Sequence, residues 1–399
     1  MSPGLLTHDP PAQPATPRAV SAVRATCSQL AADDPGWRAF ATQHAEFPLQ
    51  HPDWLDTLTS AYGLRARVTA LIDPRGSILA GLPAIRAKLP WRRAWTSLPF
   101  TDTFEPIAAT RADRDRLLAA IAEYATDPTA RGEEARCEPV RCEPVHGELM
   151  HGETDRHESA GDEPARGEPV LLRSHADLPG WTARQVGTVQ TIDLSEGVDG
   201  VLRGAKPKTR QNIKLARKAG VTARPIVSRE EFMGANLDLI ARSRRRLGAP
   251  TQPRRYWSRV WELHERGQAL TIGVYLRETL VANAIFVIGA RHATFKYSAS
   301  ETQTRNLRSN YLAFATALEH LQERGTQSLD FGITDLHNTS LRRYKVHWGG
   351  EEQPAYFSAT DAALLPDTLE PGRLVTKAIQ RSPVFVGRAI GSLAYPFVA

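Results

Sequence analysis

The sequence contains few of the features that mark secreted, metal-binding or membrane-spanning proteins. Only three of its 399 residues are cysteine (Cys27, Cys137 and Cys142), and they lack the paired spacing of metal ligands. No window holds the roughly 18 consecutive apolar residues that a membrane span needs. The N-terminus, rich in Pro and Ala, lacks the charged and then apolar pattern of a signal peptide. These absences predict a reduced, cytoplasmic protein with no metal ion and no tightly bound cofactor.

Acidic residues are missing from one stretch of the C-terminal half. Between residues 203 and 224 there are eight basic residues and no acidic one: Arg203, Lys206, Lys208, Arg210, Lys214, Arg217, Lys218 and Arg224. A second basic cluster spans residues 242–259, whereas acidic residues concentrate in 133–168. This charge suits a phosphorylated substrate, a nucleic acid or an anionic membrane surface. A solvated helix face explains any single residue equally well.

Composition and periodicity divide the chain into four parts. Residues 1–45 have the composition of a flexible leader, and 46–190 form an N-terminal α/β half. Within that half, degenerate repeats such as RCEPV and HGE predict a disordered insertion at 129–172. Residues 191–360 form a C-terminal α/β domain. The tail, 361–399, mixes apolar and basic residues, which is typical of a short interfacial helix at the inner face of a membrane or of a helix docked on the domain.

The hydrophobic pattern predicts alternating helices and strands in an α/β fold with a mixed sheet. Helices are expected at 51–63, 113–126, 206–220, 230–248, 255–267 and 310–325. Strands are expected at 65–73, 77–87, 93–100, 181–194 and 328–333, in a three-strand meander within 269–300, and at 354–359. The segment 336–350, which ends in two glycines, is expected to be a loop.

Several short motifs occur in an order that closely resembles the FemAB-like branch of the GNAT acyltransferase superfamily. They are Lys208–Arg210–Ile213, Arg245–Gly248, Phe295–Ser300, Asn310–Tyr311, Asp330–Gly332, Tyr344–Lys345 with Trp348–Gly349 and, in the N-terminal half, Gln50…Trp54, Gly81–Pro83 and Ser97–Phe100. The resemblance covers about residues 47–358 without the insertion. It implies two tandem GNAT-like halves and transfer of an acyl or aminoacyl group to an amine of a cell-envelope or exopolysaccharide precursor, such as a glycan or peptide.

The resemblance makes Lys345 the leading candidate catalytic residue. The family has a lysine at this place, thought to stabilise developing negative charge, and an ammonium suits that role. A surface lysine in a turn is the alternative. Tyr344 adjoins the site, and Tyr344 and Trp348 are expected to pack and fix the segment. No general base stands out: Asp330 is the acidic candidate, although a cap or an ion-pair partner is the commoner role for such a residue.

The donor site departs from the pattern of acetyl-CoA enzymes. Their Arg/Gln-x-x-Gly-x-Gly/Ala loop presents backbone N–H groups to a pyrophosphate. Here Arg305 matches the first position, but Arg308 and Asn310 replace the glycines. The Fem-type enzymes depart in the same way and use aminoacyl-tRNA, so the anionic donor is either acyl-CoA or aminoacyl-tRNA. The helix start near Asn310 can bind an anion together with Arg308, or Asn310 is a simple N-cap.

Further candidates would bind substrate. Lys208, Arg210 and Arg246 can hold phosphates. Lys296 and Tyr297 lie on the strands where a GNAT sheet opens, and one of them is expected to face the core. The first helix, HPDWLDTL, has no lysine, unlike the bridge-forming enzymes, which argues against a peptidoglycan precursor.

Two other functions remain open at this stage. One is a conventional acetyl-CoA-dependent N-acetyltransferase. The other is a non-catalytic, basic nucleic-acid-binding protein, although helix-turn-helix, RRM and zinc patterns are missing and DNA is not an expected partner.

Overall fold

The structure is a computed structural model that describes residues 25–86, 94–102, 104–126, 168–365 and 373–398. The N-terminal half contains β1 (Thr26–Ala31), α1 (Pro35–His44), α2 (Pro52–Tyr62), β2 (Arg65–Ile72), β3 (Ile78–Arg86), β4 (Trp95–Thr96), β5 (Ile107–Ala108), α3 (Arg111–Thr126) and β6 (Val170–Ser174). A short 3-10 turn, Pro48–Gln50, precedes α2.

The C-terminal half is built around a second run of strands. It contains β7 (Thr182–Asp193), α4 (Gly197–Gly204), α5 (Pro207–Lys218), β8 (Val221–Pro225), α6 (Arg229–Glu231), a π-helical turn (Phe232–Asn236), α7 (Leu237–Leu247), α8 (Arg254–Glu265), β9 (Ala269–Leu276), β10 (Thr279–Ile288), β11 (His292–Ser300), α9 (Ser309–Glu323), β12 (Ser328–Asp335), α10 (Thr339–Val346) and β13 (Glu351–Ala359). Two helices follow, α11 (Arg373–Arg381) and α12 (Val384–Val398).

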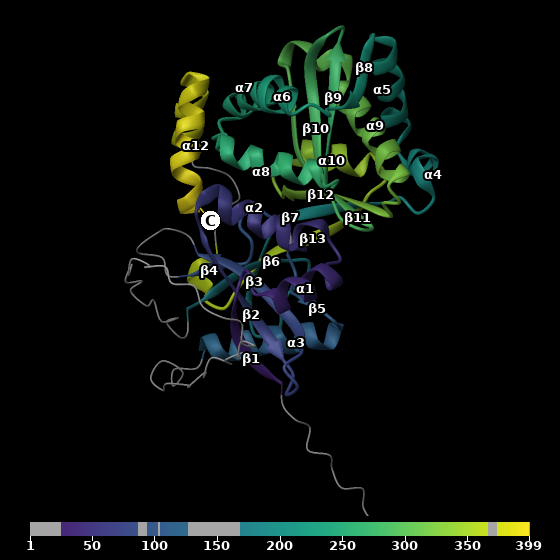
Figure 1. Cartoon of the computed structure of the whole chain (residues 1–399). Coiled ribbons are helices and arrows are strands. Elements are labelled where there is room, and N and C mark those ends of the chain that lie inside the picture. The colour runs from purple at the N-terminus through teal and green to yellow at the C-terminus, as the bar shows by residue number, and fades with distance from the viewer. Residues whose placement is uncertain (1–24, 87–93, 103, 127–167, 366–372, 399) are drawn as a thin grey trace, which may run out of the picture.

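The described strands form one mixed sheet, which confirms the predicted α/β architecture. Its order is β1-β2-β3-β4-β6-β13-β7-β12-β11-β10-β9-β8, with β5 beside β3. Most neighbours are antiparallel, but each half contains one parallel pair, β4–β6 and β11–β12. β13 pairs with both β6 and β7 and so joins the halves. Figure 1 shows the N-terminal half (purple and blue) below the C-terminal half (teal and green).

Proline and capping residues mark the helix starts as expected. Pro52 and Pro207 occupy the first turns of α2 and α5, where a missing N–H costs nothing. The side chain of His51 also accepts from the Asp53 N–H (3.3 Å) and caps α2. Both helices bury an apolar stripe, which on α5 includes Ile213 and Ala216.

The structure corrects four boundaries. The leader prediction of 1–45 was wrong in part, because β1 and α1 lie within it. The predicted insertion, 129–172, was wrong at its C-terminal end, because β6 begins at Val170; its residues 129–167 lie outside the described residues. The C-terminal half begins with β7, at Thr182 rather than near residue 191. The strand expected at 93–100 shrinks to β4, because Leu98 and Phe100 adopt left-handed backbone angles that end it.

The two halves share a hydrophobic core. Trp54 and Tyr62 of α2 pack against Tyr256 of α8, with ring centroids 6.5 and 5.7 Å apart. All three side chains are almost fully buried. Burying a large aromatic side chain stabilises a fold by about 1.5–3 kcal/mol. This contact therefore fixes the halves relative to each other.

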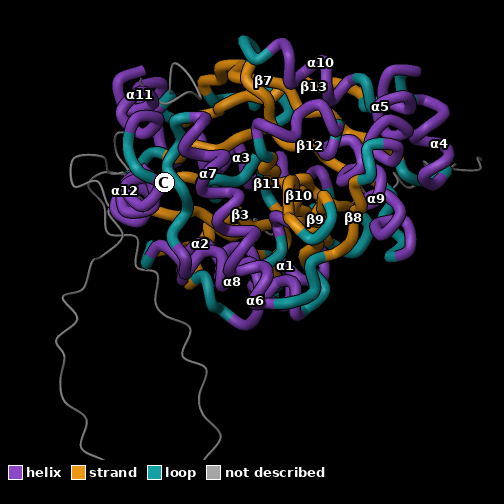
Figure 2. Tube along the Cα trace, turned by 90° about the horizontal axis from the view of Figure 1, so that it is seen from above, coloured by secondary structure: helices purple, strands orange, loops and turns teal. Residues whose placement is uncertain are grey.

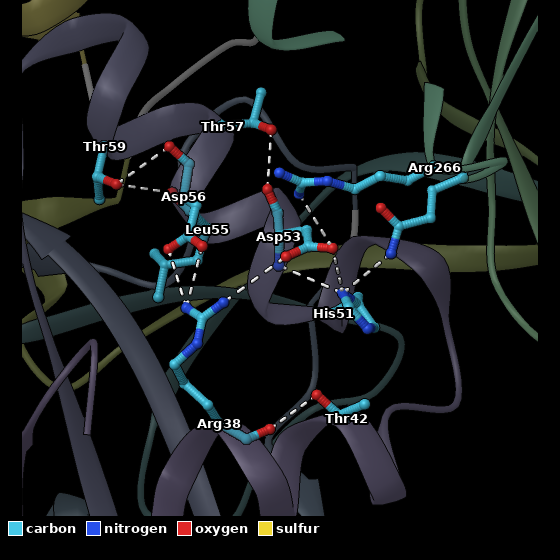
Figure 3. Close-up of polar contacts among 10 residues, drawn as sticks. Arg38, Thr42, His51, Asp53, Leu55, Asp56, Thr57, Thr59 and Arg266 are labelled. Atoms are coloured by element: carbon cyan, nitrogen blue, oxygen red, sulfur yellow. Dashed lines mark hydrogen bonds and ion pairs between the residues drawn. The ribbon is translucent and has the colours of Figure 1, made fainter. Parts of the chain in front are cut away.

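A polar network at the edge of the same interface contributes less to stability than the aromatic contact does. Asp53 lies between Arg38 of α1 (3.6 Å) and Arg266, which follows α8 (3.3 Å), and Arg38 also pairs with Asp56 (3.0 Å). Figure 3 shows Asp53 between the two guanidinium groups. Because both arginines are partly exposed, each pair is worth no more than about 1 kcal/mol. The network orients the interface rather than holding it.

Candidate active site

The C-terminal sheet opens between β11 and β12. The two strands pair in parallel from His292–Ser328 to Thr294–Asp330, where the pairing ends although both strands continue. On its other side β12 pairs with β7, and that register shifts between Asp330 and Ile333. A bulge of this kind bends a strand and re-aims its side chains. The sheet is therefore open beside Lys296 and Gly332.

A carboxylate from the N-terminal half fills this opening. Asp102 accepts from the Lys296 ammonium at 2.7 Å and from the Ile333 N–H at 3.2 Å, so it bridges the separated strands. Its loop is held to β6, because Ser97 N–H donates to the Leu171 carbonyl and Arg173 donates to that of Thr101. Sequence reasoning missed Asp102; the only signal was the nearby family-like motif Ser97–Phe100.

Gly332 gives Asp102 the room it needs. Its φ of +71° is a left-handed angle that other residues rarely adopt, and a Cβ there would lie 2.9 Å from the Asp102 Oδ1. Any other residue at this position would strain the backbone and displace the Asp102 carboxylate.

Lys345 approaches the same point from the other side. The segment 336–350, expected to be a loop, contains the helix α10, which begins where the Asn338 side chain accepts from the Leu341 N–H. This helix directs Lys345 inward, where it is 3% exposed and its Nζ donates to the Gly332 carbonyl at 2.6 Å. Burial lowers the pKa of Lys345 to about 8, although Asp102 and Asp330 favour its charged form.

Asp330 completes a cluster of two carboxylates and two ammonium groups. Its Oδ1 accepts from the Gly332 N–H at 2.6 Å. Burial, and secondarily the charge of Asp102, raise the pKa of Asp330 to about 7. Burial also disfavours the charged form of Asp102, but the Lys296 ammonium, together with Lys345 and Arg173, outweighs it and keeps the pKa of Asp102 below its ordinary value. Two neighbouring carboxylates with different proton affinities can divide acid–base roles.

A cavity of about 700 Å³ opens beside Asp330 and is lined by both halves of the chain. Five carboxylates line it (Glu46, Glu105, Asp193, Asp330 and Glu351), and no Lys or Arg does among the described residues. Glu105 pairs with Arg114 at 2.6 Å, whereas Glu46, Asp193 and Glu351 have no cationic partner in the described part of the chain. The cavity is therefore electronegative. A second cavity, of about 410 Å³, lies within the N-terminal half and contains none of the cluster residues.

Of the residues predicted to bind substrate, Lys296 lies in the cluster, but three basic residues lie elsewhere. Arg210 donates to the Leu202 carbonyl (2.9 Å) and to that of Ala205, at the end of α4. Arg246 ties α7 to the Ser300 carbonyl at the end of β11 (2.9 Å). Lys208 is exposed and contacts only Gln211 within the described residues (3.3 Å).

The aromatic candidates pack as expected. Tyr297, next to Lys296, faces the core, where its hydroxyl meets that of Tyr256 at 2.7 Å. Tyr344 lies edge-on to Tyr311 with ring centroids 5.2 Å apart. Trp348 is fully buried against Phe314. These contacts fix α10 and hence Lys345.

The N-cap of α9 is not Asn310, which excludes one of the two alternatives for that residue. The cap position is Arg308, whose φ is +57°, and its side chain makes no capping hydrogen bond. Asn310 is exposed in the first turn. The side chain of Arg305 lies outside the described residues. Within the described residues no side chain therefore caps this turn, although the Tyr311 N–H donates to the Arg308 carbonyl at 2.9 Å.

Comparisons with known proteins agree with this architecture. Residues 205–346 match the model of the acetyltransferase (GNAT) domain. The structure of FemX is 14% identical and superposes with a TM-score of 0.58, covering 83% of this chain and 96% of that one. The C-terminal domain of an Agrobacterium fabrum protein described as a lysylphosphatidylglycerol synthetase is 14% identical, with a TM-score of 0.50 and coverages of 82% and 92%.

A tandem GNAT protein from the clavulanic acid pathway is also 14% identical, with a TM-score of 0.47 and coverages of 85% and 99%. No curated protein matches the chain. The matched domain includes β11, α9, β12 and Lys345, and the FemX superposition extends to the N-terminal half that supplies Asp102. Residues 205–346 thus match a GNAT acetyltransferase domain, and the chain as a whole has a fold similar to that of FemX.

Proposed function

We propose that the protein transfers an acyl or aminoacyl group to the amine of a cell-envelope or exopolysaccharide precursor, with Asp102, Asp330 and Lys345 as its catalytic centre. The observation that carries this proposal is Asp330, a carboxyl with a pKa of about 7 that opens on an electronegative cavity beside a buried ammonium.

The proton of the attacking amine would pass to Asp330. The amine nitrogen attacks the acyl carbonyl, a C–N bond forms, and the bond from the carbonyl carbon to the donor oxygen or sulfur breaks. Asp330 takes the nitrogen proton and later releases it to the leaving group or to water. A base works best when its pKa is near the working pH, and a value of about 7 meets that condition. Asp102, held ionised by Lys296, would orient the amine.

Lys345 would stabilise the oxyanion of the tetrahedral intermediate. Its ammonium is buried and fixed by the Gly332 carbonyl, so it needs little reorganisation as charge develops. A single preorganised contact of this kind is worth roughly 10²–10³ in kcat.

The electronegative cavity favours a cationic acceptor. Glu46, Asp193 and Glu351 would attract an ammonium group and repel a phosphate. We therefore expect the acceptor to enter by its amine, with any phosphate of the precursor outside. This favours an amine-bearing glycan or peptide and agrees with the missing lysine in α2.

Two features favour aminoacyl-tRNA over acyl-CoA as the donor. Asp102 occupies the gap between β11 and β12 and accepts a hydrogen bond from the Ile333 N–H. Fewer backbone groups at this strand edge are then free to bind the extended thioester arm of a coenzyme. The outer face of α5 exposes Lys206, Lys208, Lys214 and Lys218, none of which has an ion pair among the described residues. A face of this kind suits a polyanion larger than a coenzyme. A cytoplasmic location follows from either donor.

A donor and acceptor screen tests the proposal. The whole chain is incubated with acyl-CoA, acyl-carrier protein or aminoacyl-tRNA and a set of amino sugars and basic peptides, and products are identified by mass spectrometry. We expect an N-acylated product that is lost in Asp102→Ala and Lys345→Met. Saturable transfer from acetyl-CoA would favour the conventional N-acetyltransferase. Salt-sensitive binding of arbitrary duplexes without any transfer would favour the nucleic-acid-binding alternative.

A further inference from the structure

The C-terminal helix α12 packs on the protein through its smallest residues. The Thr251 N–H donates to the Gly387 carbonyl at 3.2 Å, and a Cβ on Gly391 would lie 1.8 Å from the Thr251 carbonyl oxygen. One turn further, Tyr395 is 8% exposed and stacks on Tyr62 of α2, with ring centroids 5.6 Å apart. These contacts fix the rotation of α12 about its axis.

This rotation leaves an apolar face toward solvent. Phe385 and Leu393 are 70% and 72% exposed, and Ala389, also exposed, lies between them at helical spacing. Leu247, at the end of α7, is 65% exposed, and the next residue, Gly248, contacts Thr376 of α11. Three of the four large apolar side chains in the described chain that exceed 60% exposure thus lie at this edge. An exposed apolar face of this kind marks an interaction surface.

Figure 1 shows α12 (yellow) upright at one side of the molecule, and Figure 2 places α11 and α12 together at that edge beside α7. We call the exposed residues of this edge the α11–α12 face: Leu247, Lys377, Arg381, Phe385, Ala389 and Leu393.

The charge on the α11–α12 face has one sign. Residues 373–398 contain no Asp or Glu. Lys377 and Arg381 are exposed and form no ion pair within the described residues, whereas Arg388 is paired with Asp238 of α7 at 2.6 Å. Cations beside an apolar stripe are the combination that binds an anionic bilayer: the apolar side chains enter the acyl boundary and the cations meet the headgroups.

We propose that the α11–α12 face docks the protein on an anionic membrane surface. A second copy of the chain fits the face less well, because residues 373–398 contain no acidic residue that could pair with Lys377 and Arg381. Among the described residues no helix is long and apolar enough to cross a bilayer, so the contact is with the surface. Tyr395 also lies edge-on to Phe100, at 5.1 Å, in the loop that carries Asp102. The docked helix therefore touches the loop that carries Asp102.

Vesicle sedimentation tests the proposal without any acyl donor. The whole chain is mixed at low salt with vesicles of phosphatidylcholine alone or with about one third phosphatidylglycerol. We expect binding to the anionic vesicles that weakens as salt rises. Phe385→Ser/Leu393→Ser should weaken it about tenfold for each residue. Lys377→Gln/Arg381→Gln should weaken it about fivefold for each cation.

Matched controls use exposed residues elsewhere. Leu215→Ser/Val227→Ser and Arg75→Gln/Arg277→Gln remove equal numbers of exposed apolar residues and charges and should leave binding unchanged. Absence of wild-type binding to anionic vesicles would overturn the proposal, as would equal loss in the controls. A lipid-free dimer in sedimentation velocity that Phe385→Ser/Leu393→Ser abolishes would assign the face to a second copy instead.

Discussion

Replacing Lys345 by methionine removes the buried ammonium and keeps the length of the side chain. The variant loses the 2.6 Å hydrogen bond to the Gly332 carbonyl, which as a charged contact is worth about 1.5–3 kcal/mol. It also loses the cost of burying a charge, so the two effects on folding oppose each other. We expect a folded protein whose stability changes by no more than about 2 kcal/mol. Acyl transfer should fall by roughly 10²–10³ in kcat, the effect of losing one oxyanion contact.

The assay measures kcat for the donor and acceptor pair that the screen selects, with thermal unfolding followed in parallel. Arg75→Met is the matched control, because it removes an exposed cation from the turn between β2 and β3. It should leave both kcat and stability unchanged. Full activity in a folded Lys345→Met protein would refute the reasoning and leave Lys345 a structural residue.

Three further predictions concern the same region. Gly332→Ala should destabilise the fold and lower transfer, because it combines a left-handed φ costing about 1–2 kcal/mol with a clash against Asp102. Gly76→Ala is the control: its φ is +85° and the space around it is open, so it should lose only the stability that the backbone strain costs. An equal loss of stability in Gly332→Ala and Gly76→Ala would show that the clash with Asp102 contributes nothing. Asp330→Asn should stabilise the protein more at about pH 8 than at about pH 5. The folded pKa of Asp330, about 7, lies above the unfolded value, so the protonated carboxyl of the wild type stabilises the fold at low pH and this stabilisation is lost as pH rises through 7. Equal changes in the free energy of unfolding in urea at both pH values would contradict this. Tyr395→Phe should cost about 1 kcal/mol in the same measurement, because it removes the hydrogen bonds to Arg244 (2.9 Å) and the Pro250 carbonyl (3.1 Å); unchanged stability would show that the ring alone anchors α12.

Local signals were sufficient for much of the fold. Proline at the start of a helix, glycine after its end and regular apolar spacing predicted α2 and α5 within a few residues. The segment around Lys345 was expected to be a loop because Gly349–Gly350 dominated the pattern. The Asn338 cap and the packing of Tyr344 against Tyr311 stabilise a helix there instead.

The candidate site was harder to predict because it is assembled from distant parts of the chain. Asp102 meets Lys296 across 194 residues and Ile333 across 231. No local pattern carries that information. Arg210 is the opposite case. Its motif predicted that it binds substrate, but its side chain donates to backbone carbonyls at the end of α4. Lys345 and Asp330 were proposed as site residues mainly through a resemblance, and the structure places both against Gly332; their catalytic roles stay predictions.

The most direct test of the central claim is the pH dependence of kcat/KM for acyl transfer to an amine, measured for the wild type and for Asp330→Asn. If Asp330 accepts the amine proton, the wild-type rate rises through a pH near 7 and falls above about pH 8, where Lys345 loses its proton. The rise near pH 7 disappears in the variant, whose rate is low at every pH. A rise near pH 7 that persists unchanged in Asp330→Asn would contradict the proposed chemistry.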